Sequence, residues 1–135
     1  MGLRHALLSW LLVIGWGWLS QYDPGVMEGV VARRQGWGQL PPAPPQLAGY
    51  VATADCSELG QLLWLQAPNR EWELFMVADC PHNATVAGWM RYGNGKYPII
   101  AEVDSATVER WQLPRGRGYL TQWTTDPCGV FVPCQ

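Results

Sequence analysis

The chain has 135 residues, nine of them tryptophan, with 48% hydrophobic and 15% charged residues and a formal net charge of −2. Because single domains typically have about 100–150 residues, this length argues strongly against a two-domain enzyme with a separate cofactor domain. The near-neutral charge argues against a nucleic-acid-binding protein, which needs a basic surface to neutralise phosphates, and the hydrophobic fraction excludes a wholly disordered chain.

Residues 1–20 have the pattern of a secretory leader. Arg4 and His5 form a basic start, and an apolar run follows over residues 6–19. A bilayer span requires about 20 apolar residues, so this run is closer in length to the apolar region of a signal peptide. Cleavage after Gly17 would remove it, and an uncleaved segment would be an N-terminal anchor; a buried globular helix is the remaining interpretation. Both export interpretations place the protein outside the cytoplasm, secreted or at the cell envelope, with membrane contact only through the N-terminal segment.

Residues 21–46 are predicted to form a short helix and a linker. The apolar residues of this segment recur with the spacing i, i+1, i+4 and i+5, at Val26, Met27, Val30 and Val31. This spacing predicts an amphipathic helix that ends at the Gly-Trp-Gly sequence of residues 36–38. The proline-rich run 41–45 predicts an extended linker, because each proline ring fixes φ and removes a hydrogen-bond donor. The compact domain is therefore expected at residues 47–135.

The remaining chain is predicted to be mainly β. Short apolar segments bounded by turn residues are typical of strands, and they lie at 49–54, 61–66, 72–78, 97–103, 119–123 and 130–132. Residues 72–78 alternate, with residues 72, 74, 76 and 78 on one strand face and residues 73, 75 and 77 on the other. A polar loop is expected at 80–96, and a helix capped by Asp104 or Ser105 at 105–112. Many short strands with one or two short helices predict a small β-barrel.

The four cysteines agree with export, because disulfides persist in oxidising compartments. Of the three possible connectivities we favour Cys56–Cys80 and Cys128–Cys134. Closing a loop of about 15–25 residues contributes roughly 3 kcal/mol to stability. A zinc site built from Cys56, Cys80 and His82 is disfavoured because the chain has no C-x-x-C pair, so no metal or other cofactor is expected.

Two carboxylates are candidates for catalysis because each follows an apolar strand. Asp79 ends the segment Phe-Met-Val-Ala-Asp, and Asp104 ends Ile-Ile-Ala-Glu-Val-Asp. Strand ends deliver side chains to the rim of a barrel, where a partly buried acid can protonate a leaving group. The alternative is structural, because an Asp between a strand and a helix commonly caps the helix. Both interpretations remain open for each residue.

Trp89 is the aromatic residue that best fits a ligand site. It lies in the predicted polar loop between the two acids, together with Arg91 and Tyr92. An aromatic ring stacks on the apolar face of a sugar, while neighbouring polar groups bond the hydroxyls. Simple packing of Trp89 is the alternative.

The two Asp-containing segments also resemble a known superfamily. A strand followed by Asp79-Cys80, a loop, and then Glu102-Val103-Asp104-Ser105-Ala106 before a short helix is similar to the double-psi β-barrel proteins, which include rare lipoprotein A-like proteins, expansins and barwin. The resemblance covers residues 49–123 and implies a six-stranded double-psi barrel whose partner is a polysaccharide. By position, Asp104 matches the family's helix-opening acid and Asp79 the earlier acid.

Departures from that pattern bear mainly on catalysis. Cys80 and Pro81 replace the Gly-Pro pair of many bacterial relatives, and His82 follows Asp79, whereas the enzymes often place a His upstream in the barrel. The resemblance implies lytic transglycosylase-like or glycosidase-like chemistry if the protein is an enzyme, which the residues leave open.

Three hypotheses follow for an exported envelope domain. In the first, it binds or remodels a wall polysaccharide similar to peptidoglycan, with Asp79 and Asp104 at the barrel rim. In the second, it is a non-catalytic sugar-binding module that uses Trp89, Arg91 and Tyr92. In the third, it is a structural or protein-interaction domain held at the envelope by its N-terminus. None of them involves nucleic acid, and the oligomeric state is open.

Overall fold

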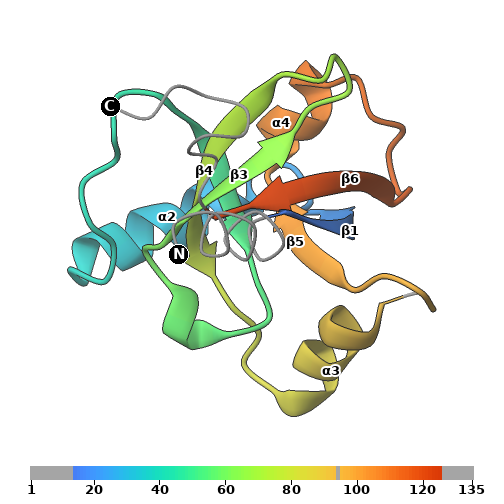
Figure 1. The fold of residues 1–135 in the computed structure, drawn as a ribbon. Coiled ribbons are helices and arrows are strands. Elements are labelled where there is room, and N and C mark those ends of the chain that lie inside the picture. Colours follow the sequence, from blue (N-terminus) through green and yellow to red (C-terminus); the bar gives the residue numbers. More distant parts are fainter. Residues whose placement is uncertain (1–13, 94, 126–135) are drawn as a thin grey trace, which may run out of the picture.

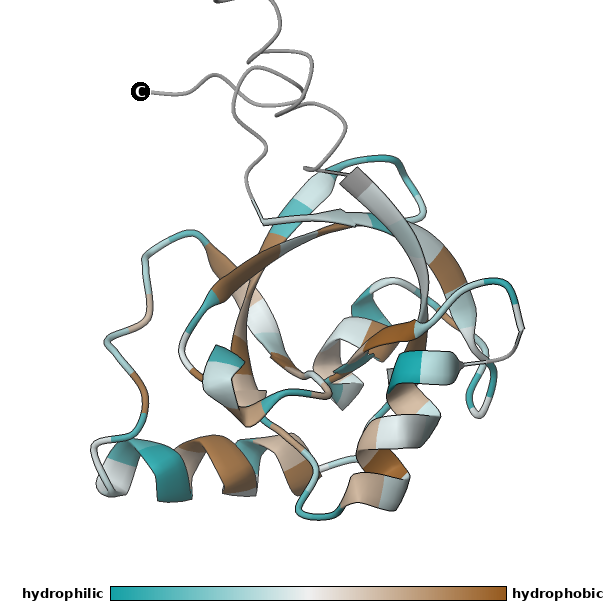
Figure 2. Ribbon diagram, turned by 60° about the horizontal axis from the view of Figure 1, so that its bottom comes forward, coloured by the Kyte–Doolittle hydropathy of each residue, from teal (hydrophilic) through white to brown (hydrophobic). Residues whose placement is uncertain are grey.

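The structure is a computed structural model that describes residues 14–93 and 95–125. It contains a closed barrel of six strands, and Figure 2 shows their ring from one end. The strands, in chain order, are β1 (Ile14–Gln21), β2 (Leu47–Ala52), β3 (Leu62–Gln66), β4 (Trp72–Asp79), β5 (Ile99–Val103) and β6 (Tyr119–Thr124). The predicted mainly β fold with a six-stranded barrel is confirmed. The expected strand at 130–132 lies outside the described residues.

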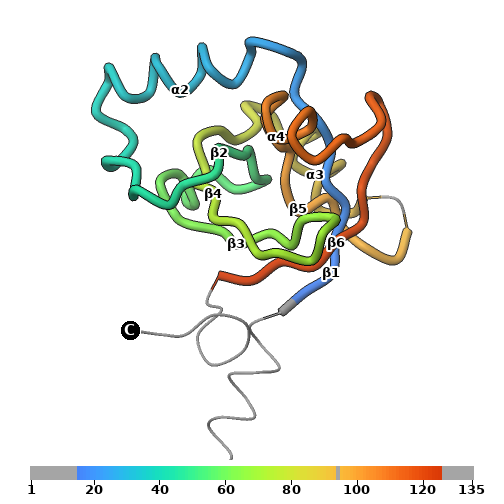
Figure 3. The backbone as a smooth tube through the Cα atoms, turned by 90° about the horizontal axis from the view of Figure 1, so that it is seen from above, coloured from blue at the N-terminus to red at the C-terminus, as the bar shows by residue number. Residues whose placement is uncertain are grey.

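Around the barrel the strands follow the order β1-β5-β2-β4-β3-β6. Two neighbouring pairs are parallel, β1 with β5 and β2 with β4, and the other four are antiparallel. A parallel pair needs a crossover connection, so the chain passes over the barrel ends between these strands. The α-helices lie between consecutive strands, at residues 26–36 between β1 and β2, 84–92 between β4 and β5, and 105–110 between β5 and β6, as Figures 1 and 3 show.

Strand β1 is the main difference from the predicted organisation. Residues 14–20, expected within a leader, belong to β1, which pairs along β6 from Ile14 to Leu19 and along β5 from Trp18 to Gln21. Leu19 is 1% exposed in the barrel core. The barrel therefore starts before residue 47, and the predicted boundary at residue 20 lies inside a strand. The hydrophobic pattern alone could not distinguish a leader from a buried strand, because both are continuous apolar runs.

The predicted helix is present as α2 (Val26–Gly36), ending before Trp37 as expected. Its buried side chains are Met27, Val30 and Val31, which pack with Ala52 of β2 and Ala78 of β4. Strand β4 is therefore covered on both sides, and its residues 74–78 are all buried. Both faces of the alternating strand therefore contribute buried residues, because α2 covers the face that points away from the barrel core.

The segment expected as a polar loop contains a second helix, α3 (Ala84–Tyr92). Asn83 caps it, accepting a hydrogen bond of 2.9 Å from the Val86 backbone N–H. Figure 1 shows α3 protruding beside β5. The loop prediction was wrong because Gly88 and the flanking polar residues are typical of a loop, and a helix of only nine residues gives a weak pattern.

The predicted helix after β5 is α4 (Ser105–Arg110), with Asp104 as its N-cap. The predicted disulfide Cys56–Cys80 is also present and joins the 3₁₀ turn Cys56–Glu58 to the end of β4. Cys128 and Cys134 lie outside the described residues. Within the described part of the chain, no helix has the length and apolar character required to span a membrane.

Candidate functional site

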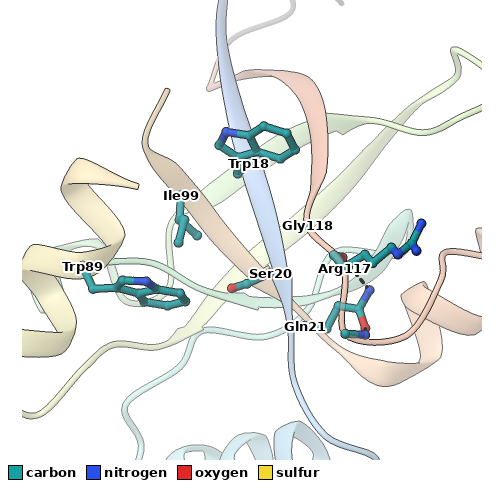
Figure 4. Close-up of a pocket in the computed structure, with 8 residues that line it drawn as sticks. Trp18, Ser20, Gln21, Trp89, Ile99, Arg117 and Gly118 are labelled. Carbon is teal, nitrogen blue, oxygen red and sulfur yellow. Dashed lines mark hydrogen bonds between the residues drawn. The ribbon is translucent and has the colours of Figure 1, made fainter. Parts of the chain in front are cut away.

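A cleft of about 360 Å³ crosses strand β1, and we call it the tryptophan cleft. Figure 4 shows Trp89 of α3 on one side of β1 and the loop of Arg117 and Gly118 on the other, with Trp18 above them. Its lining residues are Trp18, Ser20, Gln21, Trp89, Ile99, Gly116, Arg117 and Gly118. The half-exposed indole of Trp89 thus opens onto a groove that combines aromatic and polar groups.

The shape of this cleft is fixed by β1 and by one glutamine. A register shift between Trp18 and Leu19 changes the pairing of β1 with β5 at this point. The side-chain amide of Gln21 donates to the carbonyls of Pro114 and Arg117 at 2.8 and 3.1 Å, and its Oε1 accepts from Gly116 N–H at 3.1 Å. These three hydrogen bonds hold the arginine-bearing loop against β1, so the cleft is preformed.

A second cavity, of about 250 Å³, lies at the end of β4, and we call it the acidic cavity. Its ionisable lining residues are Tyr22, Asp79, His82 and Glu102. Asp79 is not free in it: Arg34 of α2 forms an ion pair with the carboxylate at 2.9 Å, and the Tyr22 hydroxyl donates to its other oxygen. Burial and this hydrogen bond raise the pKa of Tyr22, so the phenol stays protonated as the donor.

Glu102 is the carboxyl group of this cavity that the sequence analysis did not select. Burial raises its pKa, the nearby Asp79 raises it further, and the Ser20 hydroxyl partly offsets both effects. Ser20 Oγ is buried, and its approach to Glu102 lies outside ordinary hydrogen-bond geometry. The sequence did contain a signal for Glu102: it is the one charged residue within the apolar strand β5.

Asp104 occupies a different position from Asp79. It is 7% exposed, and its carboxylate accepts from Thr107 N–H at 3.1 Å and from Tyr50 N–H at 3.2 Å. The same carboxylate leaves no space at Gly49, where an added Cβ would lie 2.7 Å from Asp104 Oδ2. The structure thus shows Asp104 capping α4 and joining it to β2, whereas Asp79 lines the acidic cavity.

The three predicted binding residues of α3 do not face one site. Trp89 lines the tryptophan cleft, Arg91 lines a separate cavity of about 420 Å³ that also contains Asp55 and Glu58, and Tyr92 is 79% exposed. Residues 89 and 91 point in different directions because they lie two positions apart on a helix and not in a loop, and Tyr92 does not line the cleft. The groups that accompany Trp89 are instead Trp18 and Arg117, which are distant in sequence and gave no local motif.

The described residues contain no group of three or more His, Cys, Asp or Glu side chains arranged to hold a metal ion. No protein-family model matches the chain, and no curated protein matches it in sequence. The site is therefore interpreted from its own geometry.

Proposed function

We propose that this protein is an extracytoplasmic polysaccharide-binding domain whose glycan lies in the tryptophan cleft. The observation that carries the proposal is the position of Trp89, half exposed on the wall of a preformed cleft that also contains Trp18 and Arg117. Binding sites for small ligands are typically concave and lined by aromatic side chains with a few polar groups, which is the setting of Trp89. Two indoles along one groove supply stacking surfaces, and the polar residues Gln21 and Arg117 at its edge supply hydrogen-bonding groups, the combination that suits a sugar.

Two further observations support this assignment. The closed six-stranded barrel, with Asp79 ending β4 and Asp104 opening α4, is compatible with the double-psi barrel superfamily, whose members act on wall polysaccharides. The Cys56–Cys80 disulfide is consistent with an oxidising compartment at or outside the cell envelope. A wall glycan similar to peptidoglycan is therefore the first ligand to test.

The test is sedimentation with insoluble peptidoglycan and with plant-type polysaccharides. We expect Trp89→Ala to weaken binding at least about tenfold, which corresponds to about 1.4 kcal/mol. Trp37→Ala is the matched control, because Trp37 is 65% exposed at the end of α2 and does not line the cleft. Equal binding by the two variants would contradict the assignment, and absence of any glycan binding would favour the structural or protein-interaction hypothesis.

A catalytic function is the second candidate, and a specific observation favours it. Asp79 and Glu102 line the same cavity, and one is ion-paired with Arg34 while burial raises the pKa of the other. Carboxyl groups whose environments differ in this way can serve as an acid and an anionic partner in glycoside cleavage. Incubation with peptidoglycan tests this function: release of soluble fragments by the wild type and loss of release in Glu102→Gln would support it.

A further inference from the structure

The acidic cavity adjoins the tryptophan cleft. Ser20 lines the cleft and approaches Glu102, which lines the cavity. Helix α3 borders both spaces, with Trp89 facing the cleft and Val86 and Met90 facing the cavity. A chain of linked sugars seated on Trp89 could therefore extend a substituent toward Glu102.

The two carboxyl groups of the acidic cavity, Asp79 and Glu102, differ in whether they form an ion pair. Arg34 neutralises Asp79, and among the described residues no ion pair of lysine, arginine or histidine involves Glu102. An ionised Glu102 thus leaves one uncompensated negative charge in a partly buried space, which is unfavourable until a cation enters. The raised pKa of Glu102 agrees with this description.

Ser20 lies beside Glu102 at this junction. Its Oγ is buried and therefore closed to a ligand, and its hydroxyl partly offsets the effect of burial on the pKa of Glu102. Figure 4 shows the Ser20 side chain directed from β1 toward Trp89. The junction of the two spaces therefore offers the Glu102 carboxylate as the acceptor for an incoming donor.

From this geometry we infer that Glu102 recognises a protonated primary amine carried by the bound glycan. An ammonium group has three donors and one positive charge, so it can form a charged hydrogen bond with Glu102 and keep donors for other acceptors. A cavity of about 250 Å³ accommodates such a substituent. The inference rests on the proposed polysaccharide-binding function and specifies its substrate class: glycans with free amines are preferred over their N-acylated forms.

The amine can come from two sources, the sugar itself or the diamino acid of an attached peptide. The experiment uses the full chain and two pairs of probes. The first pair is a fully de-N-acetylated and a fully N-acetylated chito-oligosaccharide of equal length. The second is a peptidoglycan fragment with a lysine-containing peptide, with its ε-amine free or acetylated. Binding is measured by the change in tryptophan fluorescence or by titration calorimetry at mildly acidic pH.

We expect the wild type to prefer the free amine in at least one pair by about tenfold or more, which corresponds to about 1.4 kcal/mol. Glu102→Gln should reduce the affinity for that probe to the level of its acylated counterpart. Glu28→Gln, which removes the same charge from the exposed face of α2, should retain the preference. The pair that shows the preference identifies the source of the amine.

Three outcomes would overturn the inference. If the wild type binds both members of each pair equally and Trp89→Ala still weakens binding, the amine specificity is wrong while the polysaccharide-binding function stands. If Glu102→Gln is folded by circular dichroism and keeps the preference, another group recognises the amine. If no probe and no wall polysaccharide binds, the proposed function fails together with the inference.

Discussion

Asp104 joins α4 to β2, because its buried carboxylate accepts hydrogen bonds from the backbone N–H groups of Thr107 and Tyr50. We expect Asp104→Ala to destabilise the protein by about 2–3 kcal/mol, because it removes a helix cap and leaves buried donors unpaired. Urea denaturation measures this loss. Asp23→Ala, which truncates an exposed side chain before α2, is the control and should leave the denaturation midpoint nearly unchanged. A similar midpoint for both variants would show that the Asp104 hydrogen bonds contribute little.

Glu102 should make stability depend on pH. Folding raises its pKa, so the folded protein binds a proton more tightly than the unfolded chain does. Its contribution is most favourable below the ordinary pKa of a glutamate and is lost as pH rises through the higher folded-state pKa. Glu102→Gln should therefore be more stable than the wild type at neutral pH, with the difference disappearing in acid. Urea denaturation between about pH 4 and about pH 8 tests this, and parallel curves would contradict it.

At the scale of elements, β1 is the strand that closes the barrel. It lies between β5 and β6, and the close approach of β5 depends on Gly17, where an added Cβ would lie 2.3 Å from the Ile100 side chain. The sequence indicated an apolar segment here but not its partners. Cleavage at Gly17, which the leader hypothesis considered, would divide this strand. The leader itself remains a prediction, and residues 1–13 lie outside the described residues.

A pair of truncations tests the role of β1. A chain that starts at Ile14 keeps the whole strand and should fold, whereas one that starts at Tyr22 loses the partner of both β5 and β6 and should not. Unpaired strand edges and the loss of buried Leu19 are the physical reasons. Near-ultraviolet circular dichroism and hydrogen exchange report the result. A cooperative unfolding transition in the shorter chain would show that β1 is dispensable.

At the scale of the whole molecule, the Cys56–Cys80 disulfide joins the turn after β2 to the end of β4, next to the acidic cavity. The two cysteines are 24 residues apart, and closing a loop of this size contributes roughly 3 kcal/mol. We expect the double variant Cys56→Ala, Cys80→Ala to unfold at a lower urea concentration by a corresponding amount. Reduction of the wild type should reproduce this shift without any substitution. An unchanged midpoint in the double variant would contradict the prediction.

Local patterns in the sequence determined several parts of this protein. The apolar segments and turn residues predicted five of the described strands, and the spacing of Met27, Val30 and Val31 predicted α2. The cap at Asp104 and the disulfide Cys56–Cys80 were also predicted. These features depend on neighbours in the chain or on a simple choice among few pairings, so the signal lies within short stretches of residues.

Only the tertiary structure decided which residues share a site. Pairing of β1 with β5 and β6 brings Trp18 to the cleft wall opposite Arg117, about 100 residues later in the chain. The parallel pairing of β2 with β4, and the helix that covers both, place Arg34 on Asp79, while within residues 14–93 and 95–125 no ion pair involves Glu102. Such contacts join segments far apart in sequence through strand register and chain crossings. No local pattern encodes them, which is why the sequence by itself selected Asp79 and Asp104, whereas only the structure showed that Glu102 lines the same cavity as Asp79.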